Sequence, residues 1–484
     1  MLAFGEYRPD VSDHNASHSL TVQNVVPRAD GYGPFPDFTV FTSALPAACR
    51  GYFYARNTDG SITIFAGTST KLYKLSNTDF TWGDVSAGAG SYSALSSSDN
   101  WQFIQFGSVV IAVQANAAPQ AYTLGSSSEF AALGGSPPQA RYVSVVGRFV
   151  VLSGLLSEPY RIQWSGLAAI TTWTSGTNQS DYQDLPDGGI VRGVAGGEYG
   201  VIFQDASIRR MTYAPGSPTI FNIDRISQDD GLFAPLSLIR AGERIFFCSA
   251  QGFKALLPGG YPIPIGREKV DRTFFADVDT ANLQLMLGAA DPKQNRVYWS
   301  YKSLSGQTGL FDKIICYDWI LDRFTPITMT GEYLSSLSRP GITLDALDSI
   351  SASIDALPFS LDDVSSAAFA QLSGVNADHN LGFFTASNLE ATVDTSEQGF
   401  EGRRMFVRGF RPMTDAATVY GSVKSRESVQ ASSTTSTETL VNTQGFCPQR
   451  VSTRYARGVI RIPEGTSWTY ATGVEPDIVQ EGKR

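Results

Sequence analysis

Histidine is the side chain that most often serves as a general base or metal ligand, and this chain of 484 residues has three of them. His14 and His18 stand four residues apart in "DHNASH", and His379 lies far along the chain. The first two could bring imidazoles together, but no cysteine or carboxylate cluster joins them at the spacing of a metal site. We therefore expect a solvated polar segment there and no bound metal.

Paired carboxylates are the second chemistry to consider, because glycosidases built on propellers use them. Asp224, Asp229 and Asp230 are candidates for such a pair. Two stretches resemble Asp-box turns: "SNTDFTW" (76–82) lacks the expected glycine, and "NTDGSIT" (57–63) lacks the tryptophan. Such imperfect matches are common in turn-rich β sequence. The motifs of serine hydrolases, zinc proteases, P-loop proteins and dinucleotide-binding proteins are missing from the sequence. We predict no enzyme, no catalytic residue and no cofactor.

Tryptophan and arginine offer binding rather than catalysis. The seven tryptophans are Trp82, Trp101, Trp164, Trp173, Trp299, Trp319 and Trp468. They could stack on sugars, but their places near strand ends favour packing between sheets. Arg403, Arg404, Arg408 and Arg411 form one basic cluster, which could contact a nucleic-acid backbone. Alternate arginines on a strand are more often solvated or subunit-contact residues.

A stretch between residues 331 and 380 is rich in Ser, Asp and Leu, with a rhythm like that of calcium ligands. An EF-hand loop requires a central glycine and a terminal glutamate, and no glycine occurs between Ile342 and Ala370. We interpret residues 331–380 as a connector.

Composition restricts the class of protein. Hydrophobic residues make up 42% of the chain, charged residues only 17%, and there are 46 glycines, which suits an all-β fold with many turns. The net charge is −9, and residues 1–380 carry 35 acidic and 25 basic side chains. A nucleic-acid binder usually has a basic surface instead. The start of the chain lacks the pattern of a secretory signal, and no apolar run approaches the ~18 residues of a membrane span.

The elements that would hold any site come in repeats. Similar units begin at Tyr52, Trp101, Arg141, Ile190, Leu236 and Leu285, with spacings of 49, 40, 49, 46 and 49 residues. Most have a short strand, a glycine-containing turn, a very apolar second strand and a third strand. This period is typical of four-stranded propeller blades, whereas a pair of β-sandwiches would not explain it. The four cysteines, Cys49, Cys248, Cys316 and Cys447, lie far apart, which predicts buried free thiols.

The fold class predicted is therefore all-β, a β-propeller with about six blades followed by a C-terminal β-sandwich. Residues 1–45 would form an N-terminal arm and ring-closing segment, and residues 46–330 the propeller. Residues 331–380 would be the connector, and residues 381–484 the sandwich.

Several segments also resemble one family. They include "LTVQNVVPRADGYGPFPDFTVF" (20–41), "AGTSTKLYKL", "YRIQWSGLAAITTWTSG" and "DLPDGGIVRGVAGGEYGVIFQDASIRRMTY". Together with "RYARGVIRIPEGTSWTYATGVEPD" near the end, they are similar to tail hub or nozzle proteins of short-tailed, podovirus-type bacteriophages and prophages. The first segment departs from the family pattern at Pro36-Asp37, where Pro-Gly is usual.

The resemblance implies a structural virion protein, assembled in the bacterial host cytoplasm as a homohexameric tail ring. Its partners would be the portal and head-to-tail adaptor, and a needle or fibres. Genome DNA would be retained and then conducted through the ring without specific binding, which an acidic wall would favour. The arm 1–19 would be free to reach a neighbouring subunit. The alternatives are a receptor-binding or glycan-degrading propeller of a phage or bacterium, and a host scaffold propeller.

Overall fold

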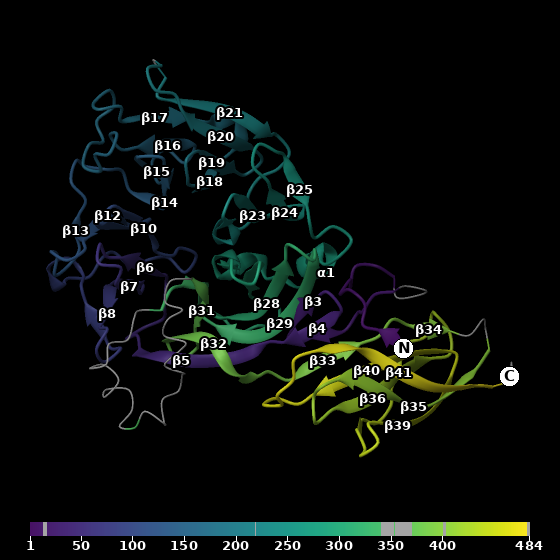
Figure 1. Cartoon of the computed structure of the whole chain (residues 1–484). Coiled ribbons are helices and arrows are strands. Elements are labelled where there is room, and N and C mark those ends of the chain that lie inside the picture. The colour runs from purple at the N-terminus through teal and green to yellow at the C-terminus, as the bar shows by residue number, and fades with distance from the viewer. Residues whose placement is uncertain (13–16, 218, 340–352, 354–369, 400–402, 482–484) are drawn as a thin grey trace.

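A computed structural model describes residues 1–12, 17–217, 219–339, 353, 370–399 and 403–481 of the chain. Figure 1 shows a ring of antiparallel sheets, with a second body of strands beside it that holds both termini. Within these residues the structure has one α-helix, α1 (Asp271–Asp277). It is far too short to cross a membrane, and no other described helix is long and apolar enough to do so. The predicted all-β class is confirmed.

The ring contains seven four-stranded sheets, each a meander of antiparallel strands. The first three are β6 (Tyr52–Arg56), β7 (Ile62–Gly67), β8 (Leu72–Leu75) and β9 (Trp82–Asp84); β10 (Gln102–Phe106), β11 (Val109–Gln114), β12 (Ala117–Thr123) and β13 (Ala131–Ala132); and β14 (Ala140–Val146), β15 (Phe149–Leu155), β16 (Arg161–Trp164) and β17 (Asp181–Asp184). The next three are β18 (Val191–Ala195), β19 (Gly200–Gln204), β20 (Ile208–Tyr213) and β21 (Phe221–Ser227); β22 (Ile239–Ala241), β23 (Arg244–Ser249), β24 (Gly252–Leu256) and β25 (Pro262–Pro264); and β26 (Gly288–Asp291), β27 (Arg296–Tyr301), β28 (Phe311–Asp318) and β29 (Arg323–Gly331). Their first strands begin within three residues of the six unit starts read from the sequence.

Packing between sheets explains the apolar second strands. β15 is buried along its whole length, and so are β19 and all but the first residue of β23. Such strands lie between two neighbouring sheets, as their almost unbroken apolar sequences predicted. The turns that precede β11 and β15 contain Gly107 and Gly147, with φ of 59° and 56°, which a glycine adopts without strain.

The seventh sheet closes the ring. It joins β30 (Tyr333–Leu337), β31 (Gln371–Val375) and β32 (Asn380–Asn388) to β5 (Pro36–Ala44), which comes from the start of the chain. The first strands β6, β10, β14 and β18 contact one another in turn, as do β22, β26 and β30, and β30 contacts β6. Arg240 of β22 donates to the Gly196 carbonyl just after β18. The ring therefore has seven blades, one more than the predicted six. Sequence periodicity missed this blade because a long interval separates β30 from β31 and its fourth strand lies at the other end of the chain.

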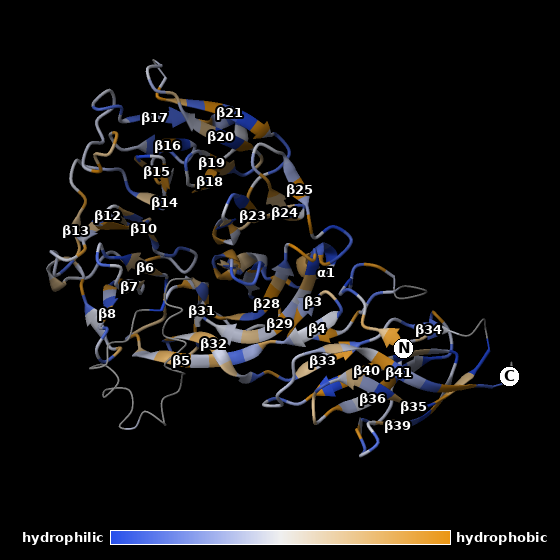
Figure 2. Ribbon diagram, in the orientation of Figure 1, coloured by the Kyte–Doolittle hydropathy of each residue, from blue (hydrophilic) through white to orange (hydrophobic). Residues whose placement is uncertain are grey.

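The second body is a β-sandwich of two sheets. One sheet has the order β3 (Val25–Arg28), β4 (Gly31–Pro34), β41 (Ala471–Gln480), β35 (Met405–Thr414) and β39 (Cys447–Thr453), with β1 (Leu2–Ala3) also on β41. The other has β2 (Val22–Gln23), β33 (Ala391–Asp394), β40 (Tyr455–Ile462), β36 (Tyr420–Arg426) and β37 (Thr434–Thr435), with β34 (Gln398–Gly399) on β40 and β38 (Thr439–Leu440) on β36. In Figure 2 the most hydrophobic colour falls mainly on the strands of both bodies.

Three predicted boundaries change as a result. The connector range 331–380 contains β30 and β31 of the last blade, and β32 belongs to that blade rather than to the sandwich. The sandwich is completed by four N-terminal strands, so the arm 1–19 is not free. Phe4 is buried against the C-terminal strands, because apolar residues of the arm fill the sandwich core.

The N-terminal segment also joins the two bodies. Its sandwich strands β2 and β3, and Asn24 between them, run along β29, the outer strand of the sixth blade. The Asn24 amide N–H donates to the Pro326 carbonyl at 3.0 Å, and the Thr328 N–H donates to the Asn24 Oδ1 at 2.8 Å. Residues 1–44 therefore complete the sandwich, contact the sixth blade and close the seventh.

Candidate functional site

Polar side chains from several blades face a common space on the propeller axis. Two adjoining cavities of about 300 and 440 Å³ share Gln102, Tyr142, Arg192, Pro235 and Leu236. We call them together the axial cavity. It is lined mainly by the first strands of the blades and by the loops that lead into them, so the ring itself positions the site. The combined space suits a small molecule.

A loop crosses the ring at one end of the axial cavity. The 3-10 helix η4 (Thr280–Leu285) precedes the first strand of the sixth blade, and Asn100 precedes that of the second. The Asn100 Nδ2 donates to the Gln284 carbonyl at 3.2 Å, which joins two blades on opposite sides of the ring. The axis is therefore interrupted at this end, and the cavity is not a bore of uniform width.

The charged groups of the axial cavity are mostly arginines. Arg192 pairs through Nε with the Asp205 carboxylate at 2.6 Å, and Arg141 pairs through Nε with Asp99 at 3.2 Å. Arg240 also lines the cavity and donates to the backbone carbonyls of Gly196 and Gly242. These three guanidiniums exceed the two carboxylates, Asp99 and Asp205, by one positive charge, and Asp99 is the one carboxylate among the described lining residues. The acidic wall inferred for a DNA channel is therefore not located on the propeller axis.

Tyr142 lies near Arg192 and Arg141 in the lining of the cavity. Burial raises the pKa of its hydroxyl to about 12, while the nearby Arg192 and Arg141 oppose the rise and Asp99 adds to it. Its ring packs on Gly154, where an added Cβ would lie 2.7 Å from the ring. Within the part of the chain that the structure describes, the Tyr142 hydroxyl has no hydrogen-bond partner. The cavity thus holds a neutral, oriented phenol beside two cations.

The two described histidines, His18 and His379, belong to no cluster that could hold a metal. His14 lies outside the described residues, and His18 is buried rather than solvated. The His379 Nδ1 is 2.7 Å from the Glu332 Oε1 in the seventh blade. Burial raises the pKa of the Glu332 carboxyl. No cluster that could hold a metal occurs among the described side chains.

The aspartates considered for catalysis are not paired with one another. Asp230 forms a buried ion pair with Lys254, and Asp224 accepts a hydrogen bond from Asn222 at 2.9 Å. Both Asp-box-like stretches are hairpin turns of the first blade, between β6 and β7 and between β8 and β9. The calcium-like stretch falls almost wholly outside the described residues. Among the described residues, Asp224 and Asp230 each contact another side chain rather than a second carboxylate.

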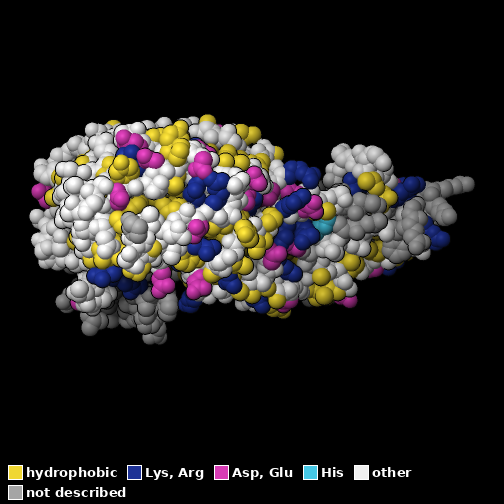
Figure 3. Space-filling model, turned by 90° about the horizontal axis from the view of Figure 1, so that it is seen from above, with side chains coloured by type: hydrophobic (Ala, Val, Ile, Leu, Met, Phe, Trp, Pro, Cys, Tyr) yellow, Lys and Arg dark blue, Asp and Glu magenta, His cyan; other side chains and the backbone are white. Residues whose placement is uncertain are grey.

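Tryptophan packing is confirmed for five of the seven side chains: Trp101, Trp164, Trp173, Trp299 and Trp468 are buried. All four cysteines are buried and free, as predicted. In the basic cluster, Arg404 pairs with Glu427 at 2.9 Å and Arg411 lies 3.9 Å from Glu475. Arg408 is exposed on β35. On the face in Figure 3, acidic and basic side chains are interspersed with hydrophobic ones.

A buried charge network in the sandwich was not anticipated. Asp394 is 1% exposed, and its Oδ1 accepts hydrogen bonds from the N–H groups of Leu20 and Thr21 at 3.0 and 2.9 Å. Arg457 lies 3.7 Å from the other carboxylate oxygen. Burial raises the pKa of Asp394, while the bond from Thr21 and the charge of Arg457 oppose the rise.

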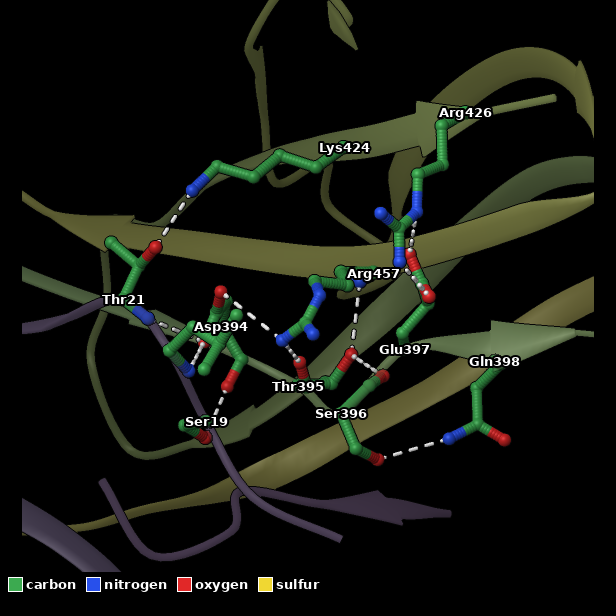
Figure 4. Close-up of polar contacts among 12 residues, drawn as sticks. Ser19, Thr21, Asp394, Thr395, Ser396, Glu397, Gln398, Lys424, Arg426 and Arg457 are labelled. Atoms are coloured by element: carbon green, nitrogen blue, oxygen red, sulfur yellow. Dashed lines mark hydrogen bonds and ion pairs between the residues drawn. The ribbon is translucent and has the colours of Figure 1, made fainter. Parts of the chain in front are cut away.

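The network continues along the same sheet. Glu397 receives two bonds from Arg426, at 2.7 and 2.6 Å, and Lys424 donates to the Thr21 hydroxyl at 2.7 Å. Figure 4 shows Asp394 and Lys424 directed toward the N-terminal segment, with the Arg426–Glu397 pair farther along the sheet. The signal in the sequence was the presence of charges inside apolar strands, as in "YARGVIRI". The charge network attaches residues 19–21 to the C-terminal strands.

A third cavity, of about 540 Å³, lies beside α1 and is lined by Asp10, Lys254, Asp271 and Arg272 among others. The Asp271 carboxylate is 8% exposed and accepts a hydrogen bond from the Phe253 N–H at 3.0 Å. Burial raises its pKa to about 6; the charge of Asp10 adds to the rise, and Lys254 opposes it.

This raised pKa predicts a pH-dependent stability. Between about pH 4 and pH 6, Asp271 holds a proton in the folded chain but not in the unfolded chain, so its contribution makes the free energy of unfolding fall as pH rises. Asp271→Asn should therefore be about 1–2 kcal/mol more stable than the wild type above pH 6.5 and equal to it at pH 4, allowing for solvent screening. Urea unfolding at pH 4, 5.5 and 7 measures this. Asp229→Asn, at an exposed site, is the control, and an equal shift in both variants would contradict the assignment.

Comparisons with known proteins extend no further than the fold. No family model and no curated protein matches the chain. A solved extracellular domain from B. thetaiotaomicron, described as part of a hybrid two-component system, has a TM-score of 0.41 and 10% identity, and the match covers 78% of this chain and 43% of that one. A chain of a mitotic checkpoint complex has a TM-score of 0.36 and 10% identity, covering 75% and 99%. This chain spans less than half the length of the first. Likeness this low carries no argument about activity or ligand.

Proposed function

We propose that this chain is a structural protein of a phage tail, the hub or nozzle ring through which genome DNA is retained and ejected. The sequence resemblance over most of residues 20–330 and the last ~80 residues motivates the proposal. The observation that carries it is the interlocking of propeller and sandwich by residues 1–44. A part that must withstand the pressure of packaged DNA benefits from two bodies that cannot separate without breaking sheets.

The path of DNA follows from the axial cavity. Because η4 crosses the ring and the cavity has the volume of a small molecule, DNA would not pass along the propeller axis. The conduit in this proposal is the opening enclosed by several copies of the chain. A net negative charge over residues 1–380 would limit phosphate binding there, which suits a passage that must let its cargo slide.

The described side chains give little support to the alternative function, a receptor-binding or glycan-degrading propeller. It requires exposed aromatic platforms or paired carboxylates, whereas five tryptophans pack in cores and Asp230 is held by Lys254. The hub is therefore the function that the described residues support best.

Electron microscopy tests the proposal directly. We expect the purified full chain, mixed with a cognate portal–adaptor complex, to form closed rings of six copies at the end of that complex. Duplex DNA should bind to the chain more weakly than a Kd of about 10⁻⁴ M at physiological salt. A chain that stays monomeric in the presence of the portal–adaptor complex, or that releases sugar from a glycan, would overturn the proposal.

A further inference from the structure

We infer that the axial cavity is a binding site for a small molecule that carries a carboxylate or phosphate group. The site lies within one copy of the chain. Ligand binding there goes beyond the proposed tail function and does not depend on it. Binding depends on three features of the cavity: two guanidiniums whose terminal nitrogens have no partner among the described residues, a tyrosine hydroxyl near both of them, and further polar side chains in the lining.

Each of the two guanidiniums is oriented by one carboxylate, which contacts it through Nε. Asp205 accepts from the Arg192 Nε, and its other oxygen accepts from the Ile190 N–H at 2.8 Å, which fixes the aspartate itself. Asp99 accepts from the Arg141 Nε in the same manner. Neither arginine has a further hydrogen bond to a described residue through its two terminal nitrogens. Each can present a planar pair of N–H donors, the geometry that matches a carboxylate or phosphate.

An arginine elsewhere in the same ring shows the contrast. Arg161 on β16 contacts Asp184 through both Nε and a terminal nitrogen, at 2.6 and 3.0 Å, and its guanidinium lies 3.9 Å from the centre of the Tyr182 ring. Its donors and its face are therefore occupied. Arg192 has the same 2.6 Å contact from Nε to an aspartate but lines a cavity with its remaining donors unused.

Tyr142 supplies a donor near the two cations. Because burial raises the pKa of its hydroxyl, it stays protonated near neutral pH and can donate to an anion. Gly154 at φ 62° fixes the ring position, since a side chain there would collide with it. Tyr142 lines the cavity as a half-buried side chain, and its hydroxyl can donate to an anionic oxygen bound beside the arginines.

The rest of the lining can contact the uncharged part of such a ligand. Gln102, Asn100 and Gln284 supply polar groups there, and Leu236 and Leu283 add apolar surface. The space, a few hundred Å³, accommodates a sugar acid, a sugar phosphate or a polycarboxylate. The anionic group is the common chemistry, and the remaining surface would decide among these ligands.

Calorimetric titration of the full chain with citrate, inorganic phosphate and glucuronate, at pH 7 and low salt, tests the inference. Glucose is the uncharged control. We expect saturable binding of at least one anion and none of glucose. Arg192→Gln should weaken that binding about tenfold or more, because a hydrogen bond to a charged group contributes roughly 1.5–3 kcal/mol. Arg161→Gln, which removes an equivalent ion pair outside the cavity, should leave it unchanged.

Two further variants keep the test decisive if Arg192→Gln folds poorly. Arg192→Lys keeps the charge but loses the paired donors, and Tyr142→Phe removes only the hydroxyl; both should weaken binding several-fold. A preference for glucuronate and citrate over phosphate would assign a carboxylate ligand, and the reverse would assign a phosphate ligand. Binding of none of the three anions at millimolar concentration, or equal binding by Arg192→Gln and Arg161→Gln, would overturn the inference.

Discussion

A chain that starts at residue 45 should lose the cooperative unfolding of both its propeller and its sandwich. This deletion removes β5, the fourth strand of the closing blade, together with β1 to β4 of the sandwich. Phe4, Val22, Val25 and Tyr32 are almost fully buried, and burial of each such side chain contributes ~1.5–3 kcal/mol. The total is comparable to the whole stability of a domain, so the loss should be complete rather than partial.

A shorter deletion separates the two effects. A chain that starts at Phe35 lacks the sandwich strands but keeps β5, so its propeller should retain a thermal transition while the sandwich signal disappears. Calorimetry and near-UV circular dichroism of both truncated chains measure the propeller and sandwich transitions. Residues 1–44, added as a separate polypeptide, should restore structure to the chain that starts at residue 45. If both chains melt their propeller within about 2 °C of each other, β5 does not close the ring in the manner described.

The second large effect concerns the buried charge network. Arg457→Met should reduce the free energy of unfolding by about 3–5 kcal/mol, because it leaves the buried Asp394 carboxylate without its cation. Both side chains are almost inaccessible, with 6% and 1% exposure. Urea unfolding followed by sandwich-specific signals is the measurement.

Arg454, an exposed arginine between β39 and β40, provides the matched control. Arg454 is 41% exposed and lies 4.0 Å from Glu427, so Arg454→Met should change stability by less than about 0.5 kcal/mol. The pH dependence gives a second check. Without Arg457 the pKa of Asp394 rises further, so Asp394 is protonated in the folded variant at a higher pH than in the unfolded chain. The stability of Arg457→Met should therefore recover as pH falls from 7 toward 4, and an unchanged defect across that range would contradict the assignment.

The interlocking by residues 1–44 also has a consequence for folding. β5 pairs with β32, more than three hundred residues away in sequence, and β1 pairs with β41 at the far end of the chain. Contacts this distant in sequence form late, because loop closure must precede them. The seventh blade and the sandwich should accordingly be completed last.

Local patterns in the sequence determined the blades. The apolar stretch that became β15 and the glycine turn before it at Gly147 are adjacent in the chain, so periodicity alone located six of the seven sheets. The same reasoning identified buried cysteines and packing tryptophans, because residue type and neighbouring strand pattern decide burial.

Only the tertiary structure decided what closes the ring and what lines its axis. β5 and β32 are joined by hydrogen bonds between distant segments, which no local period contains. The axial cavity brings together Arg141, Tyr142 and Arg192 from two blades with Asn100 and Gln284 from opposite sides of the ring. In the sequence these residues are single polar positions in separate repeats. They line one cavity because a closed ring turns the starts of its first strands toward one axis.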